Sequence, residues 1–268
     1  MPAPAVSDRV LIVAPHPDDE TLCCAGLILQ AQRAGAAVAV VWLTDGDGFE
    51  IDAVVVERTL RPRGGGLLHL GAQRMSEAQA AAAVLGVPPE NRYFLGYPDR
   101  GIARLLDADP DSLYRSGYTG ATRVPYASAL HPGTTYTGRN LRTDLGEVIA
   151  TFRPTMVMVA APQDRHSDHA RSGGLSRELL AQRAPGARLY YWIVHAGREW
   201  PRPRYYSPQL PLLPPQTAAA LDWQVLPLDS GQRALKLLAL RAHRSQMEVM
   251  SPFLLGFVRA NELFAPAR

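Results

Sequence analysis

Short apolar runs alternate along the chain with stretches of helical periodicity. The runs that predict buried strands are residues 10–14, 38–43, 92–95, 154–160 and 189–194. The stretches that predict helices are residues 21–34, 76–85, 141–152, 170–182 and 232–250. Because parallel strands need a crossover connection, usually a helix, this alternation predicts an α/β fold, a Rossmann-like, mostly parallel sheet with helices on both faces.

Two segments interrupt this alternation. Residues from about 100 to 138 are rich in Gly, Pro, Tyr, Ser and Thr, and residues from about 198 to 216 are rich in Pro. Loops of this length inside a compact domain are usually functional. No internal repeat is evident, so we expect residues 1–268 to form a single domain with two long loop insertions.

Composition and charge exclude several classes of protein. Hydrophobic residues make up 47% of the 268 residues and charged residues 20%, which allows a packed core and excludes global disorder. No stretch approaches the roughly 20 apolar residues of a membrane span, and the N-terminus lacks the layout of a signal peptide. The net charge is +3, without a dense basic run. We therefore expect a protein with no membrane span and no nucleic-acid partner. We also expect it to be cytoplasmic, unless a leader sequence has been removed.

A few residues that often carry chemistry are predicted to be structural. Cys23 and Cys24 are sequence neighbours, which rarely bridge, so we expect no disulfide and a packing role in the first helix. His195 is isolated in the sequence and is expected to be exposed or satisfied rather than a ligand. Asp45 and Asp47 follow the second strand, where they either form a turn or approach a site on the same rim.

Two clusters of titratable residues each follow a predicted strand. His16–Glu20, with the sequence HPDDE, comes directly after the first strand, and His166–His169, with the sequence HSDH, follows the strand at 154–160. Ligands of open α/β sheets bind outside the carboxyl ends of the strands. Both clusters are therefore expected on one rim, facing one crevice if the two strands are neighbours.

The residue types in these clusters predict a catalytic metal site. Two imidazoles and a carboxylate, with water in the fourth position, form an open tetrahedral zinc site. The clusters contain three histidines and at least three acids, more than a structural site needs. The surplus predicts hydrolysis, in which a free carboxylate takes a proton from metal-activated water. The spacing leaves open which of Asp18 and Asp19 binds the metal.

Together the motifs resemble the LmbE-like, or PIG-L, N-acetylglucosaminyl deacetylase family. The resemblance is carried by Ala14–Glu20 and His166–His169, and it is supported by Arg74–Glu77, the Pro98-Asp99 turn and Ala242–Gln246. It implies an LmbE-like fold and removal of an N-acetyl group from an N-acetylglucosamine-type sugar or conjugate. It also implies one zinc per chain, with iron(II) as the alternative metal, and a small-molecule amino-sugar conjugate as partner. Whether the protein forms a homo-oligomer is left open.

The resemblance also implies roles for individual residues. The implied metal ligands are His16, Asp19 and His169. Asp18 would be the general base, and His166 would stabilise the oxyanion and protonate the departing amine, with Asp168 orienting or charging its imidazole. The positions implied to contact the substrate are Arg74, Asp99 and His243. Acid–base groups of this kind suit amide hydrolysis by activated water.

The two insertions contain side chains that suit stacking on sugar rings and binding of an anionic aglycone. These residues are Tyr114, Arg115, Tyr118, Arg123, Tyr126 and Tyr136 in the first insertion and Trp200, Arg202, Arg204, Tyr205 and Tyr206 in the second. We predict that both insertions form walls of the substrate pocket. The competing interpretation is a loop packed for stability or subunit contact.

Three other functions compete with the deacetylase interpretation. A metal-dependent amidase or phosphoesterase would use similar residues, although a two-metal phosphoesterase needs ligands for a second ion. A catalytically silent carbohydrate-binding protein would be expected to lose the base or a ligand, yet all are present. A nucleotide-binding oxidoreductase is poorly supported, because the glycine fingerprint is missing after the first strand.

Overall fold

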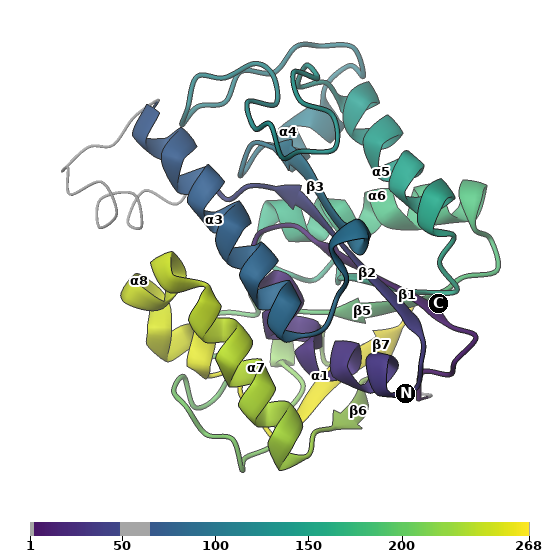
Figure 1. Cartoon of the computed structure of the whole chain (residues 1–268), viewed down its shortest axis with the longest axis vertical. Coiled ribbons are helices and arrows are strands. Elements are labelled where there is room, and N and C mark those ends of the chain that lie inside the picture. The colour runs from purple at the N-terminus through teal and green to yellow at the C-terminus, as the bar shows by residue number, and fades with distance from the viewer. Residues whose placement is uncertain (1–2, 49–64, 268) are drawn as a thin grey trace.

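A seven-stranded sheet runs through the middle of the molecule (Figure 1). The computed structural model describes residues 3–48 and 65–267. The strands are β1 (Arg9–Ala14), β2 (Ala37–Thr44), β3 (Arg92–Tyr97), β4 (Met156–Ala160), β5 (Arg188–Trp192), β6 (Gln224–Pro227) and β7 (Asn261–Pro266). Their order is β3-β2-β1-β4-β5-β7-β6, and all pairs are parallel except the two that involve β7. The predicted mostly parallel sheet is confirmed.

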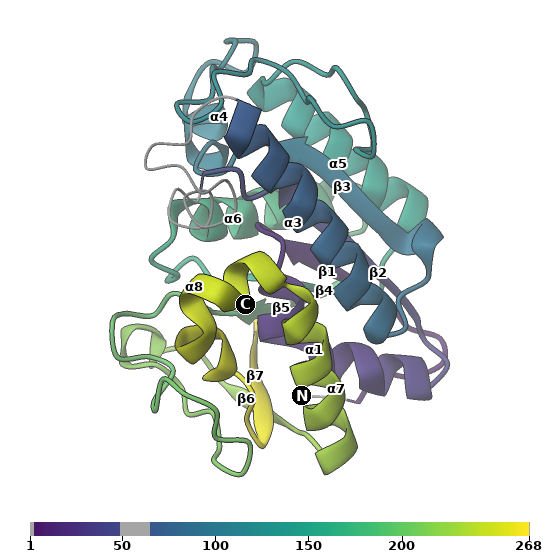
Figure 2. The same cartoon turned by 60° about the vertical axis from the view of Figure 1, so that its left-hand side comes forward.

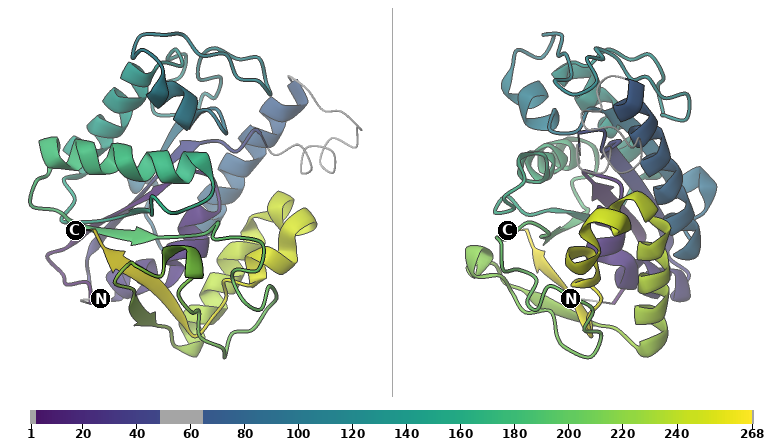
Figure 3. Two further views of the ribbon diagram at one scale, coloured as in Figure 1. Left: turned by 180° about the vertical axis from the view of Figure 1, so that it is seen from behind. Right: turned by 90° about the vertical axis from the view of Figure 1, so that its left-hand side faces the viewer.

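Helices cover both faces of the sheet, as predicted. They are α1 (Asp19–Arg33), α3 (Gly65–Val84), α4 (Ile102–Asp107), α5 (Gly138–Phe152), α6 (Ser167–Arg183), α7 (Ser230–Ala242) and α8 (Arg244–Leu255), with short 3-10 turns η1 (Pro89–Asn91) and η2 (Gln216–Ala218). Helices α1, α3 and α7 pack together on one face, and α5 and α6 on the other (Figures 2 and 3). Within the described ranges, no helix is both long and apolar enough to cross a membrane.

The two central strands form the core because their sequences are apolar without interruption. Every side chain from Val10 to Ala14 is fully buried, as are those from Ala39 to Leu43. Continuous apolar strands of this kind can be buried only when both faces of the sheet are covered. At the β2–β3 pair, the ring of Trp42 stacks on that of Phe94 with centroids 4.3 Å apart. The rigid centre of the sheet therefore lies directly beneath the loops that follow β1 and β4.

The C-terminal third differs from the prediction in two ways. The antiparallel strands β6 and β7 were not predicted, and they complete one side of the sheet. The single helical stretch predicted at 232–250 is two helices, α7 and α8, which meet at His243. His243 has non-helical backbone angles (φ −78°, ψ 65°), and its ring contacts Glu20 of α1 at 3.0 Å. The chain turns here so that α8 lies over the rim of the sheet (Figure 2).

The first insertion packs against the body of the protein. It contains α4 and a single bridge between Arg123 and Thr135, with otherwise irregular backbone. Tyr136 is fully buried, and its hydroxyl donates a hydrogen bond to Gly96 O at 3.3 Å. Leu130 N donates to Phe94 O at 2.7 Å. The insertion therefore covers the end of β3, which favours the interpretation of a loop packed for stability.

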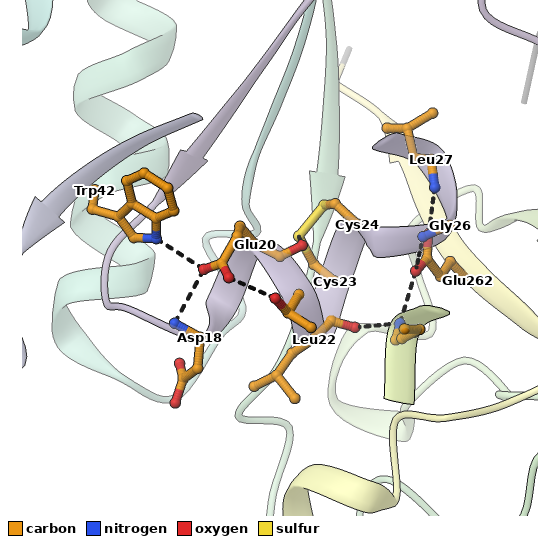
Figure 4. The surroundings of a disulfide bond; sticks show 11 residues. Asp18, Glu20, Leu22, Cys23, Cys24, Gly26, Leu27, Trp42 and Glu262 are labelled. Carbon is orange, nitrogen blue, oxygen red and sulfur yellow. Dashed lines mark hydrogen bonds and ion pairs between the residues drawn. A yellow bond between two sulfur atoms is a disulfide. The ribbon is translucent and has the colours of Figure 1, made fainter. Parts of the chain in front are cut away.

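The prediction that Cys23 and Cys24 stay unlinked is wrong, because a disulfide joins them in α1 (Figure 4). Both side chains are buried, side by side in the core. Next to them, Gly26 N and Leu27 N donate hydrogen bonds to the Glu262 carboxylate of β7 at 2.8 and 3.0 Å. The helix is thus tied to the C-terminal strand at the point where the disulfide lies, while the expected packing role of the two residues is retained.

Lys236, the only lysine of the chain, completes this connection. Its Nζ, on α7, donates to Glu262 Oε1 at 2.7 Å and to Leu22 O at 2.8 Å. Both side chains of this ion pair are 1% exposed. Because an unpaired buried charge is strongly unfavourable, the pair holds α1, α7 and β7 in one arrangement.

Candidate active site

The two predicted motifs meet at one rim of the sheet. Strand β1 ends at Ala14 and β4 at Ala160, and the two strands are paired neighbours. His16 lies in the loop between β1 and α1, whereas His169 lies in the first turn of α6. The sheet thus brings together side chains that are 153 positions apart in the sequence, with His16 Nδ1 and His169 Nε2 3.0 Å apart.

Three donor atoms face one another at this point. Asp19 Oδ2 lies 3.3 Å from His16 Nδ1 and 3.1 Å from His169 Nε2. Donor atoms bound to one tetrahedral zinc, each at about 2.0–2.2 Å, are roughly 3.3–3.6 Å from one another. All three residues are buried. Two imidazole nitrogens and a carboxylate oxygen, at this spacing, fit a single divalent metal ion.

His16 also takes part in other groupings of possible ligands. Its Nε2 lies 3.2 Å from Asp99 Oδ1 and 3.5 Å from Asp168 Oδ2. The donor atoms of His16, Asp99 and Asp168 fall within 4.8 Å of one another, and so do those of His16, His166 and His169. Every grouping includes His16, so the described residues offer alternative positions for an ion around one imidazole rather than two independent sites.

Asp164 is a site residue that the sequence analysis missed. Its Oδ2 lies 3.2 Å from His169 Nδ1 and accepts hydrogen bonds from Val194 N and His195 N, while its Oδ1 accepts one from His166 N at 2.9 Å. A carboxylate on the outer nitrogen of a metal-binding histidine fixes its orientation and tautomer. The only signal in the sequence was the position of Asp164 two residues before His166.

The field at the three donor atoms favours a positive charge. Burial by itself would lower the pKa of His169, but Asp19 and Asp164 outweigh it and raise that pKa to about 10. Burial would raise the pKa of Asp19, but His169 and His16 hold it well below the usual range. These carboxylates keep their negative charge in a buried place. A divalent cation is the natural partner of such a cluster.

Asp18 lies beside this cluster and faces a different partner. Its carboxylate Oδ2 is 3.5 Å from Arg74 Nη2, and its backbone N donates to Glu20 Oε2 at 3.1 Å (Figure 4). Burial raises the pKa of Asp18 to about 7, although Arg74 opposes the shift. Its φ of 126° is rare for a residue other than glycine, and strain of this kind is found where a side chain must be aimed.

Arg74 and Asp99, the predicted sugar contacts, both line the cavity described below. Arg74 is buried and donates to Gly46 O and Pro17 O, both at 2.9 Å, so it also holds two loops of the rim together. Gly46 has a φ of 71°, and a side chain there would collide with the Arg74 guanidinium. Asp99 N donates to Asp47 Oδ1 at 3.0 Å. Asp47 therefore approaches the site from behind Asp99, which is one of the two positions that the sequence left open for it.

His243 lies elsewhere than predicted. It is 1% exposed and does not line the cavity. Its Nε2 is 3.0 Å from Glu20 Oε1 and 3.3 Å from Thr21 Oγ1. Glu20 also accepts a hydrogen bond from Trp42 Nε1 at 2.8 Å. His243 therefore supports the start of α1 from behind and is shielded from any substrate in this structure.

His166 and Asp168 are close together, but not as expected. The backbone N of Asp168 donates to His166 Nδ1 at 3.3 Å, whereas its carboxylate accepts from Arg100 N at 2.6 Å and approaches His16. Because Nδ1 is an acceptor, a neutral His166 carries its proton on Nε2. Burial, with His16 and His169 nearby, lowers the pKa of His166 to about 2. The expectation that the Asp168 carboxylate charges this ring is thus not met.

His195 lines the cavity, a position that the sequence did not indicate, although it belongs to none of the candidate ligand groups of the described residues. It follows the end of β5, and its ring centroid lies 4.7 Å from that of His169 and 5.3 Å from that of His166. Burial, followed by the neighbouring His169, lowers its pKa to about 4. The parallel pairing of β4 with β5 brings it here, because both strands end at the same rim. An uncharged imidazole in this wall adds a hydrogen-bonding group to the site.

A cavity of about 740 Å³ opens over these residues. Its lining includes His16, Asp18, Asp19, Arg74, Asp99, His166 and His195. The α8 side is formed by Val249, Met250, Pro252 and Phe253, and the remaining lining includes Arg100, Arg165, Arg198 and Arg204. Pockets for small ligands commonly have volumes of about 300–1,000 Å³. The size suits a sugar with a substituent.

The predicted contribution of the insertions is only partly met. No described residue between positions 101 and 164 lines the cavity, so the tyrosines and arginines of the first insertion do not form its wall. Tyr126 and Tyr136 are buried instead, whereas Arg115 and Arg123 are exposed. From the second insertion, Arg198 and Arg204 reach the cavity. Both insertions follow strands that end at this rim, but β5 is the neighbour of β4, whereas β3 is separated from β1 by β2.

A mostly parallel α/β sheet with a buried His/Asp cluster at its carboxyl rim defines the class of protein, an α/β protein with a candidate metal site. Residues 11–180 match the family model described as PIG-L, GlcNAc-PI de-N-acetylase. The chain belongs to the PIG-L family, which confirms the resemblance found in the sequence.

The chain also resembles curated relatives in sequence and a solved structure in fold. A 1D-myo-inositol 2-acetamido-2-deoxy-alpha-D-glucopyranoside deacetylase of Mycobacterium sp. (strain KMS) is 29% identical over 69% of this chain and 54% of its own length. The chain thus spans about half the length of that relative. The deacetylase of the same name from Actinosynnema mirum is 28% identical over 90% of this chain and 81% of its own. The N,N'-diacetylchitobiose deacetylase from Pyrococcus horikoshii has the same fold, with a TM-score of 0.60, 23% identity and coverage of 97% and 84%.

Proposed function

We propose that the protein is a metal-dependent N-deacetylase that releases acetate from an N-acetylglucosamine-type sugar or conjugate. The observation that carries the proposal is the spacing of 3.0–3.3 Å among donor atoms of His16, Asp19 and His169. His16 and Asp19 line the cavity together with Asp18 and His166, and the buried His169 contacts both of them. The deacetylase activity of the relatives supports the reaction type. Zinc fits two imidazoles and a carboxylate, with iron(II) as the alternative.

In this mechanism His16, Asp19 and His169 would hold the metal, which supplies Lewis-acid activation of a water and of the amide carbonyl. Asp18 would accept the proton of the attacking water, since its pKa of about 7 suits a general base near neutral pH. The Nε2–H of His166 would donate a hydrogen bond to the oxyanion. Arg74 would keep Asp18 in place, and Asp99 would contact the sugar.

The low pKa of His166 favours a role as a hydrogen-bond donor rather than as an acid. Its pKa of about 2 means that the ring is neutral and donates from Nε2, as an oxyanion stabiliser must. Proton transfer to the amine then needs a proton from elsewhere in the site. Asp18 is suited to supply it, because a carboxyl that has taken the proton of water carries it into the second half of the reaction.

A two-metal phosphoesterase is the competing function. It would need ligands for a second ion about 3.5–4 Å away, usually with a bridging carboxylate. The candidate groupings among the described residues all depend on His16. His16 Nδ1 faces Asp19 and His169, whereas its Nε2 faces Asp99 and Asp168. The ring could bind an ion through each nitrogen only after losing both N–H protons, so this arrangement favours one metal per chain.

The test is acetate release from a panel of N-acetylglucosamine conjugates by the zinc-loaded protein, with and without a chelator. We expect activity with one metal ion per chain, loss of activity on chelation, and recovery when zinc or iron(II) is returned. Phosphatase activity with two ions per chain would contradict the proposal. Undiminished acetate release by fully chelated protein would exclude a metal role.

A further inference from the structure

We propose that the substrate carries an anionic substituent, a phosphate or a carboxylate, which binds to three arginines at the mouth of the cavity. This arginine cluster consists of Arg165, Arg198 and Arg204, all exposed and all lining the cavity. The inference rests on the proposed function and deepens it, because it narrows the class of N-acetylglucosamine conjugate that the protein takes.

Contacts place the three arginines on one side of the mouth. Arg165 N donates to His195 O at 2.8 Å, and its Nη1 lies 3.5 Å from the position that a Cβ on Gly197 would occupy. Arg204 Nη1 donates to Arg198 O. Arg165 therefore lies against the residue that precedes Arg198, and Arg204 lies against Arg198 itself. The cluster is built from the β4–α6 loop and the loop after β5.

The cluster borders the proposed reaction centre. Arg165 directly precedes His166, and Arg198 follows His195 by three positions. The rings of His166 and His195 have centroids 5.3 Å apart. A substituent on the sugar that holds its acetamido group near His166 would therefore extend toward these guanidinium groups.

Arg204 is held by an aromatic ring. Its Cζ lies 4.6 Å from the ring centroid of Phe253 on α8. The ring of Phe253 in turn stacks near that of His195, with centroids 6.0 Å apart. A guanidinium over an aromatic face loses less freedom when it binds a carboxylate or phosphate, because one of its faces is already positioned. Arg204 is thus the best positioned member of the cluster.

The positive charges of the cluster are not neutralised within residues 3–48 and 65–267. None of the three arginines forms an ion pair with a carboxylate there, and the nearby acid Glu199 is paired with Arg202. The acids that line the cavity, Asp18, Asp19 and Asp99, already have partners: Arg74 contacts Asp18, His16 contacts Asp99, and His16 and His169 contact Asp19.

An anion would relieve this concentration of charge. Like charges in one cleft repel each other and attract anions, and a guanidinium binds carboxylate or phosphate through two parallel hydrogen bonds. The α8 wall next to the cluster, with Val249, Met250 and Pro252, has no charged side chain to compete for it. The charge distribution would therefore orient the substrate, with its anion at the cluster and its acetamido group at the metal-binding residues.

The experiment compares three glycosides on the zinc-loaded protein: N-acetylglucosamine 1-phosphate, carboxymethyl N-acetylglucosaminide and methyl N-acetylglucosaminide. The first two carry the candidate anions and the third is neutral. We expect kcat/KM for acetate release to be at least about tenfold higher for one or both anionic glycosides. Arg198→Gln and Arg204→Gln should each lower the ratio of anionic to neutral kcat/KM by about tenfold, and added salt should lower it as well.

Arg241→Gln is the matched control, since Arg241 is an exposed arginine on α7 that does not line the cavity. It should leave the ratio unchanged. Equal kcat/KM for all three glycosides, or a ratio that neither cluster variant changes, would overturn the inference while leaving the deacetylase proposal intact.

Binding of the same glycosides to the zinc-loaded Asp18→Asn variant, measured by calorimetry, separates the two proposals. Tighter binding of an anionic glycoside than of the neutral one, weakened by Arg204→Gln, supports the subsite. If the wild-type protein nevertheless releases no acetate from any of them, the deacetylase proposal fails while the subsite stands. Neither binding nor hydrolysis of any of the three would overturn both.

Discussion

Asp18 and Asp19 are adjacent acids of the same size, both buried, and they face different partners. Asp19 Oδ2 is within 3.3 Å of ring nitrogens of His16 and His169, whereas the Asp18 carboxylate approaches Arg74. We therefore predict that Asp19→Asn weakens metal binding and that Asp18→Asn abolishes turnover with the metal retained. Asparagine keeps the shape of each side chain, so the comparison isolates the charge.

The magnitude for Asp19 follows from its contacts. The carboxylate also accepts a hydrogen bond from His16 N at 2.9 Å, so one oxygen serves three groups in a fully buried place. Removing one partner of a buried charged pair typically costs about 3–5 kcal/mol, or roughly 10²–10⁴-fold in a dissociation constant. For Asp18, loss of a general base should lower kcat by about 10²–10⁴-fold, with metal affinity little changed.

Zinc affinity is measured by competition with a chromophoric chelator, and kcat by acetate release at saturating zinc. Circular dichroism of both variants checks that each is folded. If Asp18→Asn lost the metal while Asp19→Asn kept it, the two roles would have to be exchanged. If both variants kept metal and turnover, the site itself would lie elsewhere.

Three further predictions concern neighbouring groups. His166→Ala should retain zinc and lose about 10²–10³-fold in kcat, because an oxyanion donor is removed; full activity in metal-replete protein would refute its role. Asp164→Asn should weaken zinc binding about 10–100-fold through His169, and unchanged affinity in the chelator competition would refute that support. Lys236→Ala should lower the free energy of unfolding in urea by about 3–5 kcal/mol, because it leaves Glu262 buried and unpaired, and a loss below 1 kcal/mol would show that the pair is not needed.

Much of the fold could be predicted because its central strands are apolar throughout. Residues 10–14 and 38–43 cannot be solvated in any arrangement, and the helices between the strands require parallel pairing. Strand β6 has four residues with Val225 exposed, so it carries no run that indicates a buried strand. Its pairing with β7 depends on contacts with a segment distant in the sequence, which the local pattern does not indicate. The helix break at His243 was missed for the same reason, since it depends on the contact with Glu20 of a distant helix.

A site residue could be predicted where it met two conditions: it directly follows a strand, and it belongs to a recognisable motif. His16 and His169 met these conditions, and their convergence is confirmed by the 3.0 Å between their ring nitrogens. His195 met the first condition, because it follows β5, but a lone histidine gives no indication of what lies beside it. Asp164 contacts the ring of His169 and the backbone N–H groups of residues 194 and 195, and no local pattern in the sequence records such contacts.

The matched family region, residues 11–180, is not by itself a complete working unit. Val194 to Phe253 supply His195, two of the arginines and the entire α8 wall of the cavity. Beyond them, Glu262 bonds two backbone N–H groups of the same helix that begins with Asp19. Exchanging the C-terminal third between relatives would therefore be expected to change which conjugate is accepted while the reacting groups stay in place. All the residues proposed to bind metal or to react thus lie within the family region, whereas Arg198, Arg204 and the α8 wall lie outside it, which gives the two parts room to diverge separately.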